Sequence, residues 1–83
     1  MKKGEKVYES FLLNTIDRIR MFVLLNSESQ CEIDVIKGRY TVDGKSIMGI
    51  FSLEVSRPLQ VKVTGKVSDI ERLDSLYKEK GLV

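Results

Sequence analysis

Two segments of the chain alternate between hydrophobic and polar residues, which is the period of a half-buried β-strand. Residues 31–36 and residues 59–64 each place their apolar side chains on one face and polar ones on the other. The second segment follows Pro58, whose missing N–H is tolerated at the start of a strand. We predict a strand over each. The side chains expected to face the core are Cys31, Ile33, Val35, Leu59, Val61 and Val63.

Two further strands are predicted from composition and turn chemistry. Residues 6–12 combine aromatic and β-branched side chains in a short run, although both alternations are partly apolar and the facing register is unclear. Gly38 tolerates a positive φ, so a tight hairpin turn at either 37–38 or 38–39 leads to a returning strand over 39–43.

Helical spacing begins at Ile16, after Asn14 and Thr15, which are good N-cap residues. Apolar residues then recur every three or four positions, and we expect an amphipathic helix of about three turns. Asp17 suits the positive end of the helix dipole. The apolar positions are Ile16, Ile19, Phe22 and Val23, and those left to water are Asp17, Arg18 and Glu28.

The last helix is predicted to begin at a capping box formed by Ser68 and Glu71, and to end at Gly81. Lys78 and Lys80 lie near its negative end. Its expected buried stripe is Ile70, Leu73, Leu76 and Tyr77.

The segment 46–53 (S-I-M-G-I-F-S-L) has a serine suited to capping but an internal glycine, so its residues alone leave helix and strand open. With a short helix there, the order is strand, helix, strand, strand, helix, strand, helix. We therefore predict one α+β domain over 1–83, an open-faced β-sandwich whose four-stranded antiparallel sheet carries its helices on one face.

Composition excludes several classes of function. Fourteen basic and twelve acidic residues give a net charge of +2, too small and dispersed for nucleic-acid binding. The chain has no histidine and one cysteine, Cys31, which argues against a metal site or another cofactor. We expect Cys31 to pack in the core. Without an apolar run of about 18 residues or a secretory leader, we expect a cytoplasmic protein.

The run Lys45–Gly49 (K-S-I-M-G), continued through Leu53, closely resembles the signature around the regulatory serine of histidine-containing phosphocarrier (HPr) proteins of the sugar phosphotransferase system. The resemblance extends more weakly from the first strand to the last helix. It implies the βαββαβα order of that family and a protein that is not an enzyme.

The family's phosphate-carrying histidine lies in a Gly-x-His-x-Arg-Pro pattern, and the corresponding stretch here is 13–18. Thr15 takes the histidine position and Asp17 the arginine position. An imidazole with a pKa of about 6.5 accepts and donates a phosphoryl group. A threonine hydroxyl needs a base to attack, and Asp17 would repel the phosphate. The resemblance therefore predicts a member without phosphocarrier chemistry.

Ser46 keeps its motif in full, and in the family this serine is phosphorylated by an ATP-dependent kinase. The resemblance implies a regulatory protein of the catabolite-repression type. Plain N-capping by Ser46 is the alternative. The partners expected for such a regulatory protein are an HPr kinase-like enzyme, a transcriptional regulator or phosphotransferase-system proteins.

The family's docking patch implies partner contacts here, with Met48 and Phe51 more exposed than Ile50 and Leu53. The implied contact residues are Lys45, Ile47, Met48 and Phe51. A constitutive interaction module that no phosphorylation controls remains an alternative. A nucleic-acid role is more distant, because the predicted sheet lacks an aromatic stacking platform.

Overall fold

The computed structural model describes residues 2–83, which form four strands and three helices. The predicted βαββαβα order is confirmed. The elements are β1 (Lys3–Phe11), α1 (Ile16–Ser27), β2 (Glu32–Lys37), β3 (Tyr40–Asp43), α2 (Ile47–Phe51), β4 (Leu59–Lys66) and α3 (Val67–Glu79). None of the three helices in this part of the chain is long and apolar enough to cross a bilayer.

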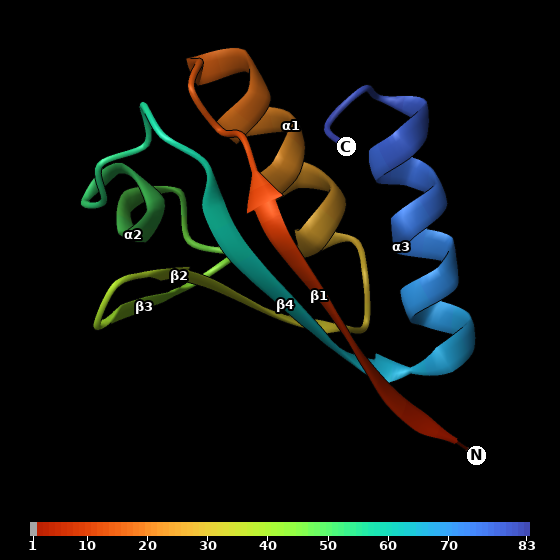
Figure 1. Cartoon of the computed structure of the whole chain (residues 1–83). Helices are drawn as coiled ribbons and strands as arrows, with labels where there is room; N and C mark the ends of the chain where they lie inside the picture. Colours follow the sequence, from red (N-terminus) through yellow and green to blue (C-terminus); the bar gives the residue numbers. More distant parts are fainter. Residues whose placement is uncertain (1) are drawn as a thin grey trace.

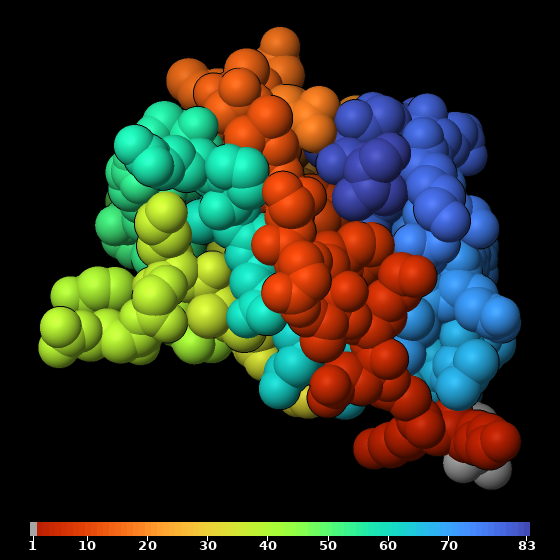
Figure 2. All heavy atoms as spheres, in the orientation of Figure 1, coloured from red at the N-terminus to blue at the C-terminus, as the bar shows by residue number. Residues whose placement is uncertain are grey.

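The strands form one antiparallel sheet in the order β1-β4-β2-β3, and the helices lie behind it in Figure 1. Ile33 pairs with Val63 and Val35 with Val61, so the apolar faces of β2 and β4 coincide. All four side chains are buried, as the alternation predicts. The β2–β3 hairpin extends beyond the rest of the molecule in Figure 2, where it is yellow-green.

The register of β1, which the sequence leaves unclear, changes within the strand. Tyr8 pairs with Val61 and Phe11 with Leu59, so β1 contains one extra residue between these pairs. Because of this irregularity, Tyr8 and Phe11 both face the helices although they are three residues apart. Their rings join Phe22 and Tyr77 in an aromatic cluster, with the Phe11 and Tyr77 centroids 5.2 Å apart in a T-shaped arrangement.

The predicted start of α3 is wrong. The helix begins at Val67, so Ser68 and Glu71 lie inside it and form no capping box. Lys66 occupies the N-cap position without a side-chain hydrogen bond. β4 continues to Lys66 because β1 pairs with it that far, and the Val67 N–H donates to the Lys2 carbonyl at 3.2 Å. The strand therefore passes into the helix without a loop.

Two expectations for the polar and apolar faces of α1 are also wrong. Ile16 is 56% exposed, although the spacing places it on the apolar face. Arg18, expected in water, is only half-exposed and bonds to backbone carbonyls. Farther along, Leu25 and Asn26 are buried, and the sequence analysis missed both.

Candidate functional site

The start of α2 is built around Ser46. The Ser46 Oγ accepts the Gly49 N–H at 3.1 Å, which is the N-cap bond expected for this serine. A Cβ on Gly49 would lie 3.2 Å from that Oγ and 3.3 Å from the Val42 Cβ. Glycine at position 49 therefore lets the first turn of α2 approach both the capping hydroxyl and β3, and the ambiguous segment is a short helix.

The backbone just before Ser46 is held by hydrogen bonds. The Ser46 N–H donates to the Asp43 carbonyl at 3.0 Å, and the Lys45 N–H to the Asp43 Oδ1 at 2.9 Å. The Lys45 Nζ donates to the Ser29 carbonyl at 3.2 Å. The Lys45 ammonium thus links the start of α2 to the turn that follows α1.

The apolar side chains of α2 divide between surface and core. Met48 is 75% exposed and Phe51 44% exposed, whereas Ile50 is fully buried. Ile47 and Leu53 are half-buried and pack against the core. Of the side chains expected to contact a partner, Met48 and Phe51 are the two that α2 presents to solvent, and Ile47 is shared with the core.

The start of α1 carries Thr15, the residue at the expected histidine position. The Thr15 Oγ1 accepts the Arg18 N–H at 3.1 Å and so caps the helix. Thr15, Ile16 and Asp17 are all exposed. α1 and α2 contact each other, so both capping residues belong to neighbouring helices on the same side of the sheet.

Arg18, which the sequence analysis left to water, binds three backbone carbonyls. Its Nε donates to the Leu12 carbonyl at 2.8 Å, and its terminal nitrogens to those of Gly81 and Leu82 at 3.2 and 3.1 Å. The Arg18 guanidinium is thus directed at the chain's own backbone. No local pattern predicts this, because the acceptors at 81 and 82 lie at the other end of the sequence.

The structure offers little to hold a metal ion or to attack a phosphoryl group. Across residues 2–83, no group of three histidine, cysteine or acidic side chains has a geometry that could hold a metal. Cys31 is a fully buried free thiol, as expected, and burial raises its pKa. The polar groups that remain at the starts of α1 and α2 are therefore the capping hydroxyls of Thr15 and Ser46.

A comparison with protein-family models matches most of this chain. The family model described as "PTS HPr component phosphorylation site" matches residues 18–77. This range includes Ser46 and begins just after the 15–17 stretch. No significant match was found among curated proteins.

Solved structures of phosphocarriers are similar over nearly the whole chain. A phosphocarrier protein HPr from Bacillus anthracis str. Ames is 26% identical, with a TM-score of 0.67 and coverage of 92% of this chain and 94% of that chain. HPr-C-His from Thermoanaerobacter tengcongensis is 29% identical, with a TM-score of 0.62 and coverage of 95% and 89%.

Proposed function

Because the chain belongs to the HPr family, whose members are phosphocarriers and not enzymes, we propose that this member has lost phosphate transfer through histidine and acts as a regulatory binding protein controlled through Ser46. It works in the cytoplasm, where a single buried thiol such as Cys31 stays reduced.

The observation that carries the proposal is the absence of histidine from a chain of this family. Thr15, the residue at the expected carrier position, has a hydroxyl that caps α1. A hydroxyl becomes a nucleophile only beside a base, and a phosphate ester is a poor donor compared with an N–P bond. Asp17 adds negative charge nearby, and the Arg18 guanidinium is occupied by three carbonyls. Phosphate transfer has no support at this position.

Ser46 offers different chemistry. Its hydroxyl caps the first turn of α2, where phosphate oxygens would find backbone N–H donors. A phosphoserine carries a charge of about −1.5 to −2 near neutral pH, which changes the surface beside Met48 and Phe51. Modification would thus alter a surface that already exposes two large apolar side chains, a composition typical of adaptable protein contacts.

The direct test is incubation with an HPr kinase and ATP. Mass spectrometry should find one phosphate on the wild type and none on Ser46→Ala, with Ser52→Ala, altered at the other end of α2, as the matched control that still accepts it. An unlabelled wild type contradicts the proposal. A second arm uses phosphoenolpyruvate and the general relay enzyme; acid-labile phosphate on the chain would contradict the loss of carrier chemistry.

The second candidate is a constitutive interaction module on the same scaffold, with a transcriptional regulator or phosphotransferase-system proteins as partners. It is favoured by the half-buried position of Ser46, whose oxygen is already bonded as a helix cap. It predicts equal partner affinity for Ser46→Ala and Ser46→Asp. In both cases Met48→Asp should weaken binding, whereas Val7→Asp, 40% exposed on β1 at the opposite edge of the sheet from β3, should not.

A further inference from the structure

A buried chain of polar groups connects α3, α1 and the segment before Ser46. Asn26, near the end of α1, is the one polar or charged residue that is buried among residues 2–83, with no exposed surface. Its Nδ2 donates to the Gly44 carbonyl at 2.8 Å, and its Oδ1 accepts the hydroxyl of Tyr77 from α3. Tyr77 is also fully buried.

Such an arrangement is costly unless every group has a partner. An amide and a phenol buried in an apolar core lose their water hydrogen bonds, and an unpaired buried group destabilises the fold. Here the demand is met, since no buried side-chain nitrogen or oxygen in the described residues lacks a partner. A leucine at 26 and a phenylalanine at 77 would fill similar space, but the carbonyl of buried Gly44 would then lose its donor, so what the pair adds is a hydrogen bond to the segment before Ser46.

Gly44, which accepts the hydrogen bond from Asn26, is held on two sides. The Gly44 N–H donates to the Ile33 carbonyl at 2.7 Å, while its carbonyl accepts from Asn26. A Cβ on Gly44 would lie 2.4 Å from the Ile33 Cγ2 and 3.1 Å from the Asn26 Nδ2. The peptide two residues before Ser46 is thereby fixed between β2 and α1, at an approach that only glycine permits.

We propose that Asn26 and Tyr77 are positioning residues for Ser46: their bond to Gly44 holds the start of α2 in the conformation that a kinase recognises. The proposal rests on the proposed function, because it assigns a role in modification at that serine. Asn26 and Tyr77 act by fixing the backbone before Ser46, and neither side chain touches the reacting hydroxyl. When the bond to Gly44 is lost, the segment 43–49 samples other conformations, and only the ordered fraction is competent.

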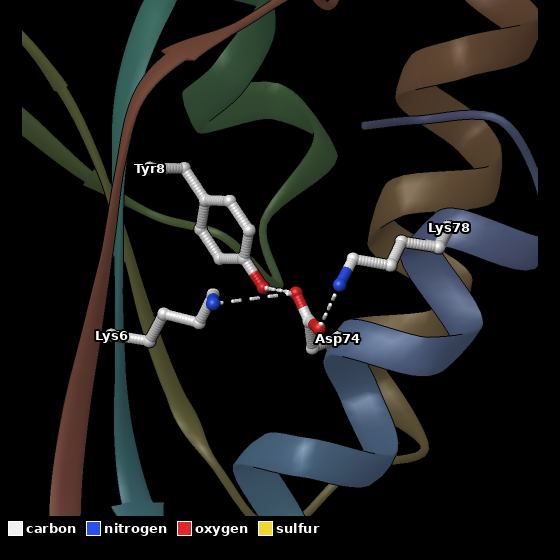
Figure 3. A network of polar contacts seen from close by, with 4 residues as sticks. All are labelled: Lys6, Tyr8, Asp74 and Lys78. Carbon is white, nitrogen blue, oxygen red and sulfur yellow. Dashed lines mark hydrogen bonds and ion pairs between the residues drawn. The ribbon is translucent and has the colours of Figure 1, made fainter.

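The chain provides a matched control. Tyr8→Phe removes a phenol hydroxyl from the same aromatic cluster, where the Tyr8 and Tyr77 rings are 5.7 Å apart. The Tyr8 hydroxyl, however, donates to the Asp74 Oδ1 at 2.5 Å, and so joins β1 to α3 (Figure 3). Tyr77→Phe and Tyr8→Phe thus differ in which segment loses its anchor.

The first measurement is amide hydrogen exchange, which needs no kinase. The reporting amides donate to the Ile33 carbonyl, the Asp43 carbonyl and Ser46; they are those of Gly44, Ser46, Gly49 and Ile50. In Tyr77→Phe these should exchange about tenfold faster relative to β4 amides, because the Asn26 Oδ1 loses its donor and the amide no longer fixes the Gly44 carbonyl. In Tyr8→Phe the ratio should equal that of the wild type. Equal acceleration of all amides in Tyr77→Phe would overturn the proposal.

A double variant separates local anchoring from overall stability. Asn26→Leu alone leaves both the Gly44 carbonyl and the Tyr77 hydroxyl unpaired. Adding Tyr77→Phe removes that hydroxyl, so the double variant should recover part of the lost overall stability. The Gly44 carbonyl lacks its donor in both Asn26→Leu and the double variant, so fast exchange at 44–50 should persist in the double variant. Restoration of wild-type exchange there would show that Asn26 and Tyr77 are purely structural.

The second measurement is the kinetics of Ser46 phosphorylation by an HPr kinase. Tyr77→Phe should raise KM about tenfold with kcat nearly unchanged, because the kinase must bind the ordered fraction. Tyr8→Phe should match the wild type, and equal KM for both variants overturns the proposal. If the wild type accepts no phosphate, the proposed function fails on its own, while the exchange experiment still decides whether Asn26 and Tyr77 hold this segment.

Discussion

At the scale of single residues, Arg18 shows how one side chain connects distant parts of the chain. A guanidinium presents several donors in a planar fork, and here three carbonyls accept from it. Two belong to Gly81 and Leu82, so the end of the chain is held against the start of α1. Leu82 is 3% exposed and its N–H donates to the Tyr77 carbonyl, so this end is part of the core.

Arg18→Met should therefore lower the free energy of unfolding by about 1–2 kcal/mol, because three carbonyls lose a charged donor and water replaces it only in part. Urea denaturation measures the change. Arg20→Met is the control, two residues along α1 and exposed, with an expected change within about 0.5 kcal/mol. Equal losses in the two variants would show that the carbonyl contacts contribute nothing.

At the scale of elements, the sequence predicts what depends on neighbouring residues. Alternation identifies β2 and β4, and of the two capping candidates Asn14 and Thr15 the structure uses Thr15. The start of α3 could not be predicted in this way, because β1 at the other end of the chain extends β4 to Lys66. The Ser68 pattern resembles a cap but lies within the helix.

The candidate site follows the same rule. The motif around Ser46 is local, and the sequence marks this serine as suited to capping although it leaves helix and strand open; its bond to the Gly49 N–H is known from the structure. The bonds from Arg18 to residue 81 and from Asn26 to Gly44 join segments that no periodicity connects. A lone asparagine or arginine on a helix is ordinarily read as solvent-exposed, so Asn26 was missed and Arg18 was wrongly assigned to water.

The uncapped start of α3 gives a prediction about this element. Lys66→Asp should raise the free energy of unfolding by about 1 kcal/mol, because a carboxylate at the N-cap can accept a hydrogen bond from a free backbone N–H of the first turn. The same carboxylate would also lie opposite Lys3 in the paired strand β1. Thermal denaturation checks this gain. Ser68→Ala should change stability by less than about 0.5 kcal/mol. A loss of about 1 kcal/mol in Ser68→Ala would mean that the serine caps the helix after all.

At the scale of the whole molecule, Asp74 ties the sheet to the last helix. Its carboxylate accepts the Tyr8 hydroxyl at 2.5 Å, the Lys78 Nζ lies 2.9 Å away, and the Lys6 Nζ lies 3.8 Å away (Figure 3). Burial by itself raises the pKa of Asp74, but the Tyr8 hydroxyl and the two lysines together hold that pKa below its usual value. β1 and α3 are thus joined through an ionised group.

This shift predicts how stability depends on pH. Because the pKa of Asp74 is lower in the folded state, its stabilising effect is complete above the unfolded value of about 3.9 and is lost as pH falls through the folded value. Asp74→Asn should lower the free energy of unfolding by about 1 kcal/mol at neutral pH, and by less in acid. Denaturation at a series of pH values measures both. Parallel curves for wild type and variant would contradict the shift.

The direct passage of β4 into α3 also sets where the chain tolerates changes in length. One residue inserted at the 66–67 junction would rotate every later helical position by about 100°, turning the face that carries Leu73 and Tyr77 away from the sheet. An insertion at the exposed hairpin tip, at Gly38, would rotate no helix, because the segments on both sides of the tip are strands. Natural variation in length should therefore collect at the hairpin and be absent from the junction.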